Sequence, residues 1–147
     1  MSAAGPYVDT SALAKWYLPE PGAEQFAAFI AGHTIAVISR LAVVELHSIL
    51  NRRRRAGEIK HNHVARVVAV FERQIAEGLI EVYPLDDRHA VEAAGIMQRI
   101  PDQPLRTLDA LHLAIALDIE ASHLVTADRV LAASAKALGL KAVLVGV

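Results

Sequence analysis

Short runs of β-branched and aliphatic residues alternate along this chain with longer stretches rich in alanine and leucine. The runs expected to form strands are residues 7–9, 34–38, 79–83, 123–126 and 142–145. The stretches expected to form helices are residues 11–18, 23–31, 41–55, 61–77, 86–100, 108–118 and 129–138. Strands that alternate with helices of this length are typical of βαβ units, in which helices cover both faces of a parallel sheet. The pattern therefore predicts an α/β fold with a mostly parallel central sheet of about five strands.

Two of the strand-forming runs indicate a sheet that is buried on both faces. Residues 35–38 have the sequence Ile-Ala-Val-Ile and residues 143–145 the sequence Val-Leu-Val, without the polar alternation of a half-exposed strand. No repeat, low-complexity segment or flexible linker divides the 147 residues, a length typical of one domain. We therefore expect a single domain over residues 1–147.

Composition and charge exclude several classes of protein. The chain has no cysteine, so disulfides and thiolate zinc sites are excluded. Its net charge of −1 means that any nucleic-acid contact must come from a local patch. No stretch approaches the ~20 apolar residues needed to span a bilayer, and residues 1–6 lack the features of a signal peptide. We expect a soluble, cytoplasmic protein with no membrane partner.

Four acidic residues interrupt otherwise apolar sequence. Asp9 ends the first expected strand, and Asp128 follows the fourth. Glu45 lies in the sequence Leu-Ala-Val-Val-Glu-Leu, and Asp109 in the sequence Leu-Asp-Ala-Leu-His-Leu. Acidic side chains are seldom buried unless they are paired or bind a metal. Because ligands of open α/β sheets bind beyond the carboxyl ends of the strands, we expect the four carboxylates to converge at one edge of the sheet.

Convergence would make these carboxylates repel one another. Two carboxylates about 5 Å apart repel by roughly 3 kcal/mol at an effective dielectric near 20, so the group would take up protons or bind a cation. Oxygen ligands without sulfur favour Mg²⁺ or Mn²⁺, and such an ion can activate water for attack on a phosphate. A simpler interpretation stands beside this one for two of the acids, because Asp9 and Asp128 are also well placed to cap the helices that follow them.

The sequences around these acids resemble the PIN-domain family and, within it, the VapC-type toxins. The matching segments, in order along almost the whole chain, are residues 8–13, 39–45, 105–114 and 124–128. The resemblance implies a Rossmann-like α/β/α sandwich and a Mg²⁺- or Mn²⁺-dependent endoribonuclease that cleaves RNA with metal-activated water. It also implies a homodimer and a cognate antitoxin protein that covers the site.

The same resemblance implies roles for individual residues. It implies that the metal is ligated by Asp9, Glu45, Asp109 and Asp128. Ser11 and Thr126 would supply hydroxyls that hold a water or a carboxylate in place.

Three other features have a structural interpretation beside a functional one. The basic run of Arg52, Arg53, Arg54 and Arg55 is either a solvated helix C-terminus or a contact to RNA phosphates. His112, one helical turn after Asp109, is more often a partly buried structural histidine than a ligand. The sequence His-Asn-His at residues 61–63 is interpreted as a polar helix start with Asn62 as a cap, not as a nuclease motif.

Other functions remain open at this point. A Mg²⁺-dependent phosphatase would be expected to carry a second aspartate two residues after the first, and Ser11 occupies that position after Asp9. The resemblance is also compatible with a PIN nuclease of RNA processing that is not a toxin, and with a non-catalytic PIN-like module that binds RNA or protein.

Overall fold

The computed structural model describes residues 5–146 and shows a five-stranded sheet in the order β3-β2-β1-β4-β5. The strands are β1 (Tyr7–Val8), β2 (Ala36–Ser39), β3 (Ile80–Tyr83), β4 (Leu124–Thr126) and β5 (Ala142–Leu144). Every pair of neighbouring strands is parallel. The predicted α/β fold with a parallel central sheet is therefore confirmed. The prediction that residues 1–6 are not a signal peptide falls mostly on residues 1–4, which lie outside the described residues.

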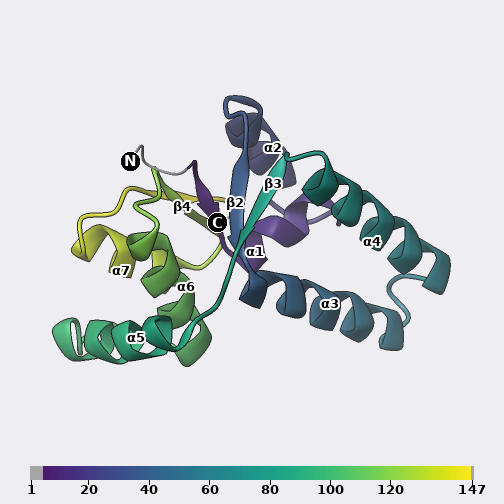
Figure 1. Ribbon diagram of the computed structural model, residues 1–147. Coiled ribbons are helices and arrows are strands. Elements are labelled where there is room, and N and C mark those ends of the chain that lie inside the picture. Colours follow the sequence, from purple (N-terminus) through teal and green to yellow (C-terminus); the bar gives the residue numbers. More distant parts are fainter. Residues whose placement is uncertain (1–4, 147) are drawn as a thin grey trace.

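Helices occupy the stretches in which the sequence predicts them, and they surround the sheet (Figure 1). They are α1 (Thr10–Leu13), α2 (Ala23–Ala31), α3 (Arg40–Arg55), α4 (His61–Ala76), α5 (Asp87–Arg99), α6 (Thr107–Asp118) and α7 (Arg129–Ala137). A short 3₁₀ helix, η1 (Ala14–Trp16), continues α1. None of the helices within residues 5–146 is long and apolar enough to cross a bilayer.

Several helix ends differ by a residue from the sequence prediction, and one predicted cap is wrong. The first helix begins at Thr10, because the Asp9 carboxylate accepts a hydrogen bond from the backbone N–H of Ala12 and so caps it. Its second half tightens into η1, as commonly happens at a helix end. Lys60, not Asn62, is the N-cap residue of α4, and its side chain makes no capping hydrogen bond.

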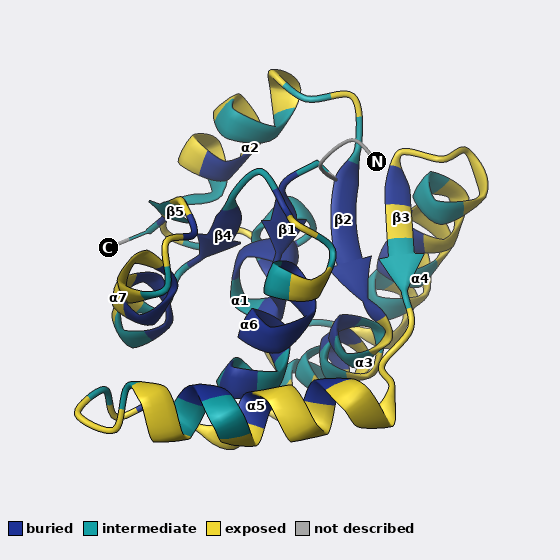
Figure 2. Cartoon of the chain, turned by 60° about the vertical axis from the view of Figure 1, so that its left-hand side comes forward, coloured by how far each residue is buried: buried dark blue, intermediate teal, exposed yellow. Residues whose placement is uncertain are grey.

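Side chains that alternate along the strands divide the core into two clusters, one on each face of the sheet. Val8, Ile38 and Val125 pack with α1, α2, α3 and α4. Tyr7 and Leu124 pack on the opposite face with α5, α6 and α7. This alternation follows from the two-residue period of a strand, and Figure 2 shows the central strands buried between the two helical layers.

The order of the strands places a crevice at the centre of the sheet. The chain winds from β1 to β2 and β3 on one side, then crosses over to β4 and β5 on the other side. The carboxyl ends of β1 and β4 therefore lie side by side at the point where the winding reverses, with Tyr7 opposite Leu124 and Val8 opposite Val125. Ligands of doubly wound α/β proteins bind at such a switch point.

Candidate active site

The four acidic residues identified in the sequence surround one cavity at this switch point. Asp9 directly follows β1, and Asp128 follows β4 as the N-cap residue of α7. Glu45 lies on α3, and Asp109 lies in the first turn of α6. The cavity that these four side chains help to line has a volume of about 380 Å³. The tertiary fold thus brings together carboxylates from four separate stretches of the chain.

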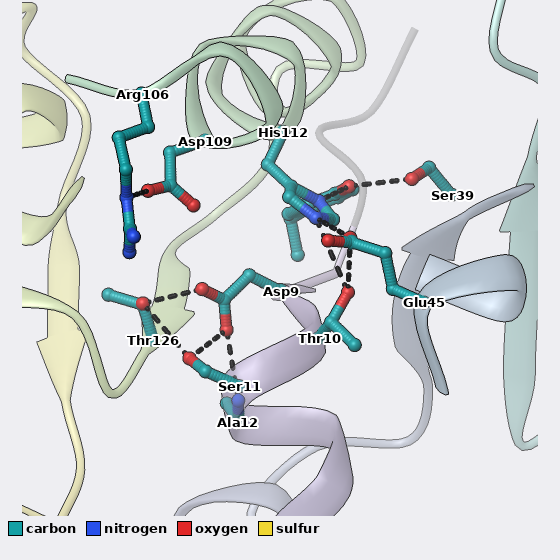
Figure 3. A network of polar contacts seen from close by, with 11 residues as sticks. Asp9, Thr10, Ser11, Ala12, Ser39, Glu45, Arg106, Asp109, His112 and Thr126 are labelled. Atoms are coloured by element: carbon teal, nitrogen blue, oxygen red, sulfur yellow. Dashed lines mark hydrogen bonds and ion pairs between the residues drawn. The ribbon is translucent and has the colours of Figure 1, made fainter. Parts of the chain in front are cut away.

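Asp9 is buried and both of its carboxylate oxygens accept hydrogen bonds (Figure 3). Oδ1 accepts from the backbone N–H of Ala12 at 2.9 Å and from the hydroxyl of Ser11 at 2.8 Å. Oδ2 accepts from the hydroxyl of Thr126 at 2.6 Å. Burial raises the pKa of Asp9, although His112 and these hydrogen bonds oppose the rise. The carboxylate is therefore held in one orientation by donors from both sides of the crevice.

Ser11 and Thr126 join the loop after β4 to the start of α1. Ser11 Oγ, besides donating to Asp9, accepts a hydrogen bond from the backbone N–H of Ala127 at 2.9 Å. Thr126 Oγ1, besides donating to Asp9, accepts from the backbone N–H of Asp128 at 2.9 Å. These two hydroxyls thus fix the relative positions of Asp9 and the backbone that carries Asp128.

Glu45 is held by two donors on other elements (Figure 3). The Thr10 hydroxyl donates to Glu45 Oε1 at 2.7 Å, and His112 Nε2 lies 2.6 Å from the same oxygen. Burial tends to raise the pKa of Glu45, but the hydrogen bonds and charge of His112, together with Thr10, outweigh it and hold the pKa below its ordinary value. Glu45 is thus favoured in its ionised form.

Asp109 and Asp128 both line the cavity, and Arg106 approaches both of them. Asp128 Oδ1 accepts from the backbone N–H of Leu131 at 2.9 Å and caps α7, so both predicted capping roles are observed. Arg106 Nε lies 3.8 Å from Asp109 Oδ2, and Arg106 Nη2 lies 3.7 Å from Asp128 Oδ2. Burial and the charges of Asp128 and Asp9 nevertheless raise the pKa of Asp109 from 3.8 to about 6. Arg106 therefore only partly offsets the effects of burial and of the neighbouring carboxylates on the pKa of Asp109.

The arginines at the end of α3 lie in different surroundings. Arg52 lines the cavity together with the four acids. Arg53, by contrast, forms ion pairs with Glu20 and, through Nε at 3.5 Å, with Glu58. The structure thus places Arg52 at the cavity, whereas Arg53 pairs with a residue of the loop before α2. An RNA contact by residues 52–55 stays a prediction.

A sequence model of the PIN domain matches residues 7–137 of the chain. The chain belongs to the PIN domain family. This match covers the four acidic residues and the described elements from β1 to α7, so the family resemblance noted in the sequence is confirmed.

Known relatives of this PIN domain agree with that assignment. Ribonuclease VapC47 of Mycobacterium tuberculosis is 29% identical over 139 residues, which cover 90% of this chain and 91% of VapC47. The crystal structure of VapC20 of Mycobacterium tuberculosis, described as a toxin that cleaves the sarcin-ricin loop, superimposes with a TM-score of 0.68 at 17% identity, covering 88% of this chain and 94% of VapC20. VapBC2 of Rickettsia felis, bound to a DNA fragment from its promoter, gives a TM-score of 0.67 at 14% identity and covers 97% of this chain and 99% of that one. At these identities the structural matches establish the fold.

The donor set of this PIN domain fits a hard divalent cation. Within residues 5–146, no three His, Asp or Glu side chains are arranged to ligate one ion as they stand, and oxygens of Asp9 and Glu45 accept hydrogen bonds from protein donors. Mg²⁺ usually keeps several waters and contacts only one or two carboxylates, so it does not require such a preformed cage. Burial and the charges of Asp128 and Asp9 raise the pKa of Asp109, and a cation bound nearby would favour its ionised form.

Some of the residues that complete this site were not among the candidates predicted from the sequence. Thr10 and His112 contact Glu45 from 35 and 67 residues away. His112 is buried and linked to a candidate ligand, beyond the general structural role that we expected. Arg106 is close in sequence to Asp109, but its approach to Asp128 depends on the loop after β4. The only signal available for His112 was its position one turn after Asp109 on the same helix.

Proposed function

We propose that this PIN domain is a Mg²⁺- or Mn²⁺-dependent endoribonuclease and the toxin of a VapBC-type toxin–antitoxin pair. The observation that carries the proposal is the cavity at the strand-switch point, lined by Asp9, Glu45, Asp109 and Asp128. Burial and the neighbouring charges of Asp128 and Asp9 raise the pKa of Asp109 to about 6. Carboxylates that share a cavity and include one with a raised pKa are typical of a functional site, and we propose that this site binds a cation.

The acidic and basic side chains around the cavity would have different roles in hydrolysis. A divalent cation, when bound, would activate water and offset the negative charge of the phosphate under attack. The four carboxylates would hold that ion directly or through the waters that Mg²⁺ keeps. The hydrogen bonds of Asp9 to Ser11 and Thr126 would orient its carboxylate. The guanidinium groups of Arg52 and Arg106, which line the same cavity, are placed to contact phosphates of a bound strand.

The choice of RNA as substrate and of an antitoxin as partner is supported by the relatives. VapC47 is named a ribonuclease, and VapC20 is described as a toxin that cleaves the sarcin-ricin loop. VapBC2 and the FitAcB complex of Neisseria gonorrhoeae share the fold of this chain. We therefore propose an RNA substrate, a cognate antitoxin that covers the cavity, a homodimer and a single domain over residues 1–147.

Cleavage of labelled RNA and of DNA with the same sequence tests the enzymatic part of the proposal. We expect the purified protein to cut RNA in Mg²⁺ or Mn²⁺ and to lose this activity in EDTA. Asp109→Asn removes one negative oxygen from the cavity and should abolish cleavage, whereas Asp102→Asn, at an exposed position in the loop before α6, should leave it unchanged. Undiminished cleavage by Asp109→Asn, or equal cleavage in EDTA, would contradict the proposal.

Growth of cells that express the protein tests the toxin part. Expression of the wild type should arrest growth, and expression of Asp9→Asn should not. Equal arrest by both variants would show that toxicity does not depend on the site. Cleavage of RNA in vitro without growth arrest would favour a nuclease of RNA processing over a toxin.

A further inference from the structure

A chain of buried polar side chains leads from the middle of the sheet to Glu45 (Figure 3). Ser39 accepts a hydrogen bond of 2.8 Å from the hydroxyl of Tyr7, whose oxygen also lies 2.6 Å from His112 Nδ1. His112 Nε2 lies 2.6 Å from Glu45 Oε1. The exposed fractions of Ser39, Tyr7 and His112 are 0%, 0% and 2%. Both ring nitrogens of His112 are therefore engaged, one by the core and one by the rim of the cavity.

His112 is a buried polar residue in a helix whose other buried residues are apolar. Its buried neighbours on α6 are the apolar residues Ala110, Leu113, Ala114, Ile115 and Ala116. An apolar residue at position 112 would continue this packing, and burial of a polar group is unfavourable unless each of its hydrogen bonds is formed. The structure provides those partners on two other elements, since Tyr7 belongs to β1 and Glu45 to α3.

The bonds of His112 restrict the side chain of Glu45. A glutamate on a helix has three side-chain torsions and samples several rotamers when it is free. Because a carboxylate only accepts hydrogen bonds, His112 Nε2 must donate to Glu45 Oε1, the oxygen that also accepts from Thr10 at 2.7 Å. Two donors on the same oxygen fix the plane and direction of the carboxylate.

We propose that His112, itself held by Tyr7, is a positioning residue that directs Oε2 of Glu45 toward the divalent cation. This inference rests on the proposed function, because it assumes that the cavity takes up such an ion. His112 would not ligate the ion: its two nitrogens serve Tyr7 and Glu45. Its effect on the ion would pass through the orientation of the Glu45 carboxylate alone.

Binding of Mn²⁺, measured by electron paramagnetic resonance or calorimetry in the absence of RNA, tests this role. His112→Leu should weaken Mn²⁺ binding about 10–100-fold, the usual effect of removing a partner of a metal-ligating side chain. His112→Gln places an amide donor near the position of Nε2 and should bind within a few-fold of the wild type. Tyr7→Phe removes only the hydroxyl behind the ring and should weaken binding by a smaller factor than His112→Leu.

His89 provides a matched control for the loss of a buried histidine. It is 2% exposed and also engages both ring nitrogens, with the backbone N–H of Asp86 at 3.0 Å and with Asp118 Oδ2 at 2.9 Å. His89→Leu should lower stability without changing Mn²⁺ affinity. If His112 were only structural, His112→Leu would behave in the same way, and Mn²⁺ affinity equal to the wild type would overturn the inference.

Different results would overturn the nuclease function and the positioning role of His112. A wild-type protein that neither binds Mn²⁺ nor cleaves RNA would overturn the proposed function and this inference together. A wild type that binds Mn²⁺ and cleaves RNA, combined with unaltered Mn²⁺ binding by His112→Leu, would overturn the inference alone. Should His112→Leu fail to fold, Tyr7→Phe and His112→Gln decide: unchanged Mn²⁺ affinity in Tyr7→Phe would contradict the positioning role.

Discussion

The hydroxyl of Thr126 donates a 2.6 Å hydrogen bond to Asp9 Oδ2 across 117 residues of sequence. It connects the carboxyl ends of β1 and β4, the two strands between which the winding of the sheet reverses. Thr126 is fully buried, and its oxygen also accepts from the backbone N–H of Asp128. One hydroxyl therefore couples the orientation of one candidate ligand to the backbone position of another.

Replacing Thr126 with valine removes this hydroxyl and keeps the shape of the side chain. Because Asp9 Oδ2 and the N–H of Asp128 would lose a partner in a buried site, we expect the free energy of unfolding to fall by about 1–3 kcal/mol. Cleavage of RNA should fall about 10–100-fold. Thr126→Ser keeps the hydroxyl and serves as the control, with activity within a few-fold of the wild type. Full activity of Thr126→Val would contradict a role in orienting Asp9.

The raised pKa of Asp109 predicts how stability depends on pH without metal. Burial and the charges of Asp128 and Asp9 raise this pKa from 3.8 to about 6. The folded protein thus holds this proton more tightly than the unfolded chain, so the contribution of Asp109 is favourable at low pH and is lost as the pH rises through about 6. Relative to the wild type, Asp109→Asn should therefore gain about 1–3 kcal/mol between about pH 4 and pH 7.5.

Urea unfolding in EDTA over this pH range measures the effect of Asp109, with Asp102→Asn as the control. The gain of Asp109→Asn over the wild type should grow with pH, while that of Asp102→Asn stays near zero. Addition of Mg²⁺ should stabilise the wild type at pH 7.5 more than the variant. A gain that shrinks as the pH rises would contradict the assigned cause of the shift.

The different environments of two adjacent arginines predict different effects on RNA binding. Arg52 lines the acidic cavity, whereas Arg53 is tied to Glu20 and Glu58. Loss of one phosphate contact reduces the slope of log affinity against log salt by about 0.7 for a single strand. We expect this reduction for Arg52→Gln, measured with the inactive Asp109→Asn background. Arg53→Gln should keep the slope and lower stability by about 1 kcal/mol, and the opposite pattern would contradict this assignment.

Close backbone packing at Gly22 predicts a local requirement for glycine. Gly22 has a φ of 88°, and a Cβ atom there would clash with the backbone of Gly146. Gly22→Ala should therefore lower the free energy of unfolding by at least about 2 kcal/mol. Gly57 has a φ of 77° but open space around it, so Gly57→Ala should show only the backbone penalty of about 1–2 kcal/mol. Chemical denaturation compares the two, and equal losses would show that the contact with Gly146 is not restrictive.

Much of the fold followed from local sequence. The runs of β-branched residues form the five strands, because such residues suit strands that are buried on both faces. The strands are parallel because a helix connects each strand to the next. Asp9 and Asp128 were recognisable as helix caps, since capping involves only residues three positions apart. Errors in the predicted elements lay at the ends of strands and helices, as with residues 34–38 for β2 and the cap Asn62 for α4.

The sequence by itself determined which acids could form a site. Asp9, Glu45, Asp109 and Asp128 each lie among apolar residues or at the end of a strand, where an acidic residue is unusual without a partner. Only the tertiary structure decided their partners. The bond from His112 to Glu45, the pairing of Arg53 with Glu20 and the position of Arg52 at the cavity depend on how α3 and α6 pack across the sheet. Such contacts join residues far apart in the chain, and no local pattern of hydrophobicity or charge specifies which distant side chains will meet.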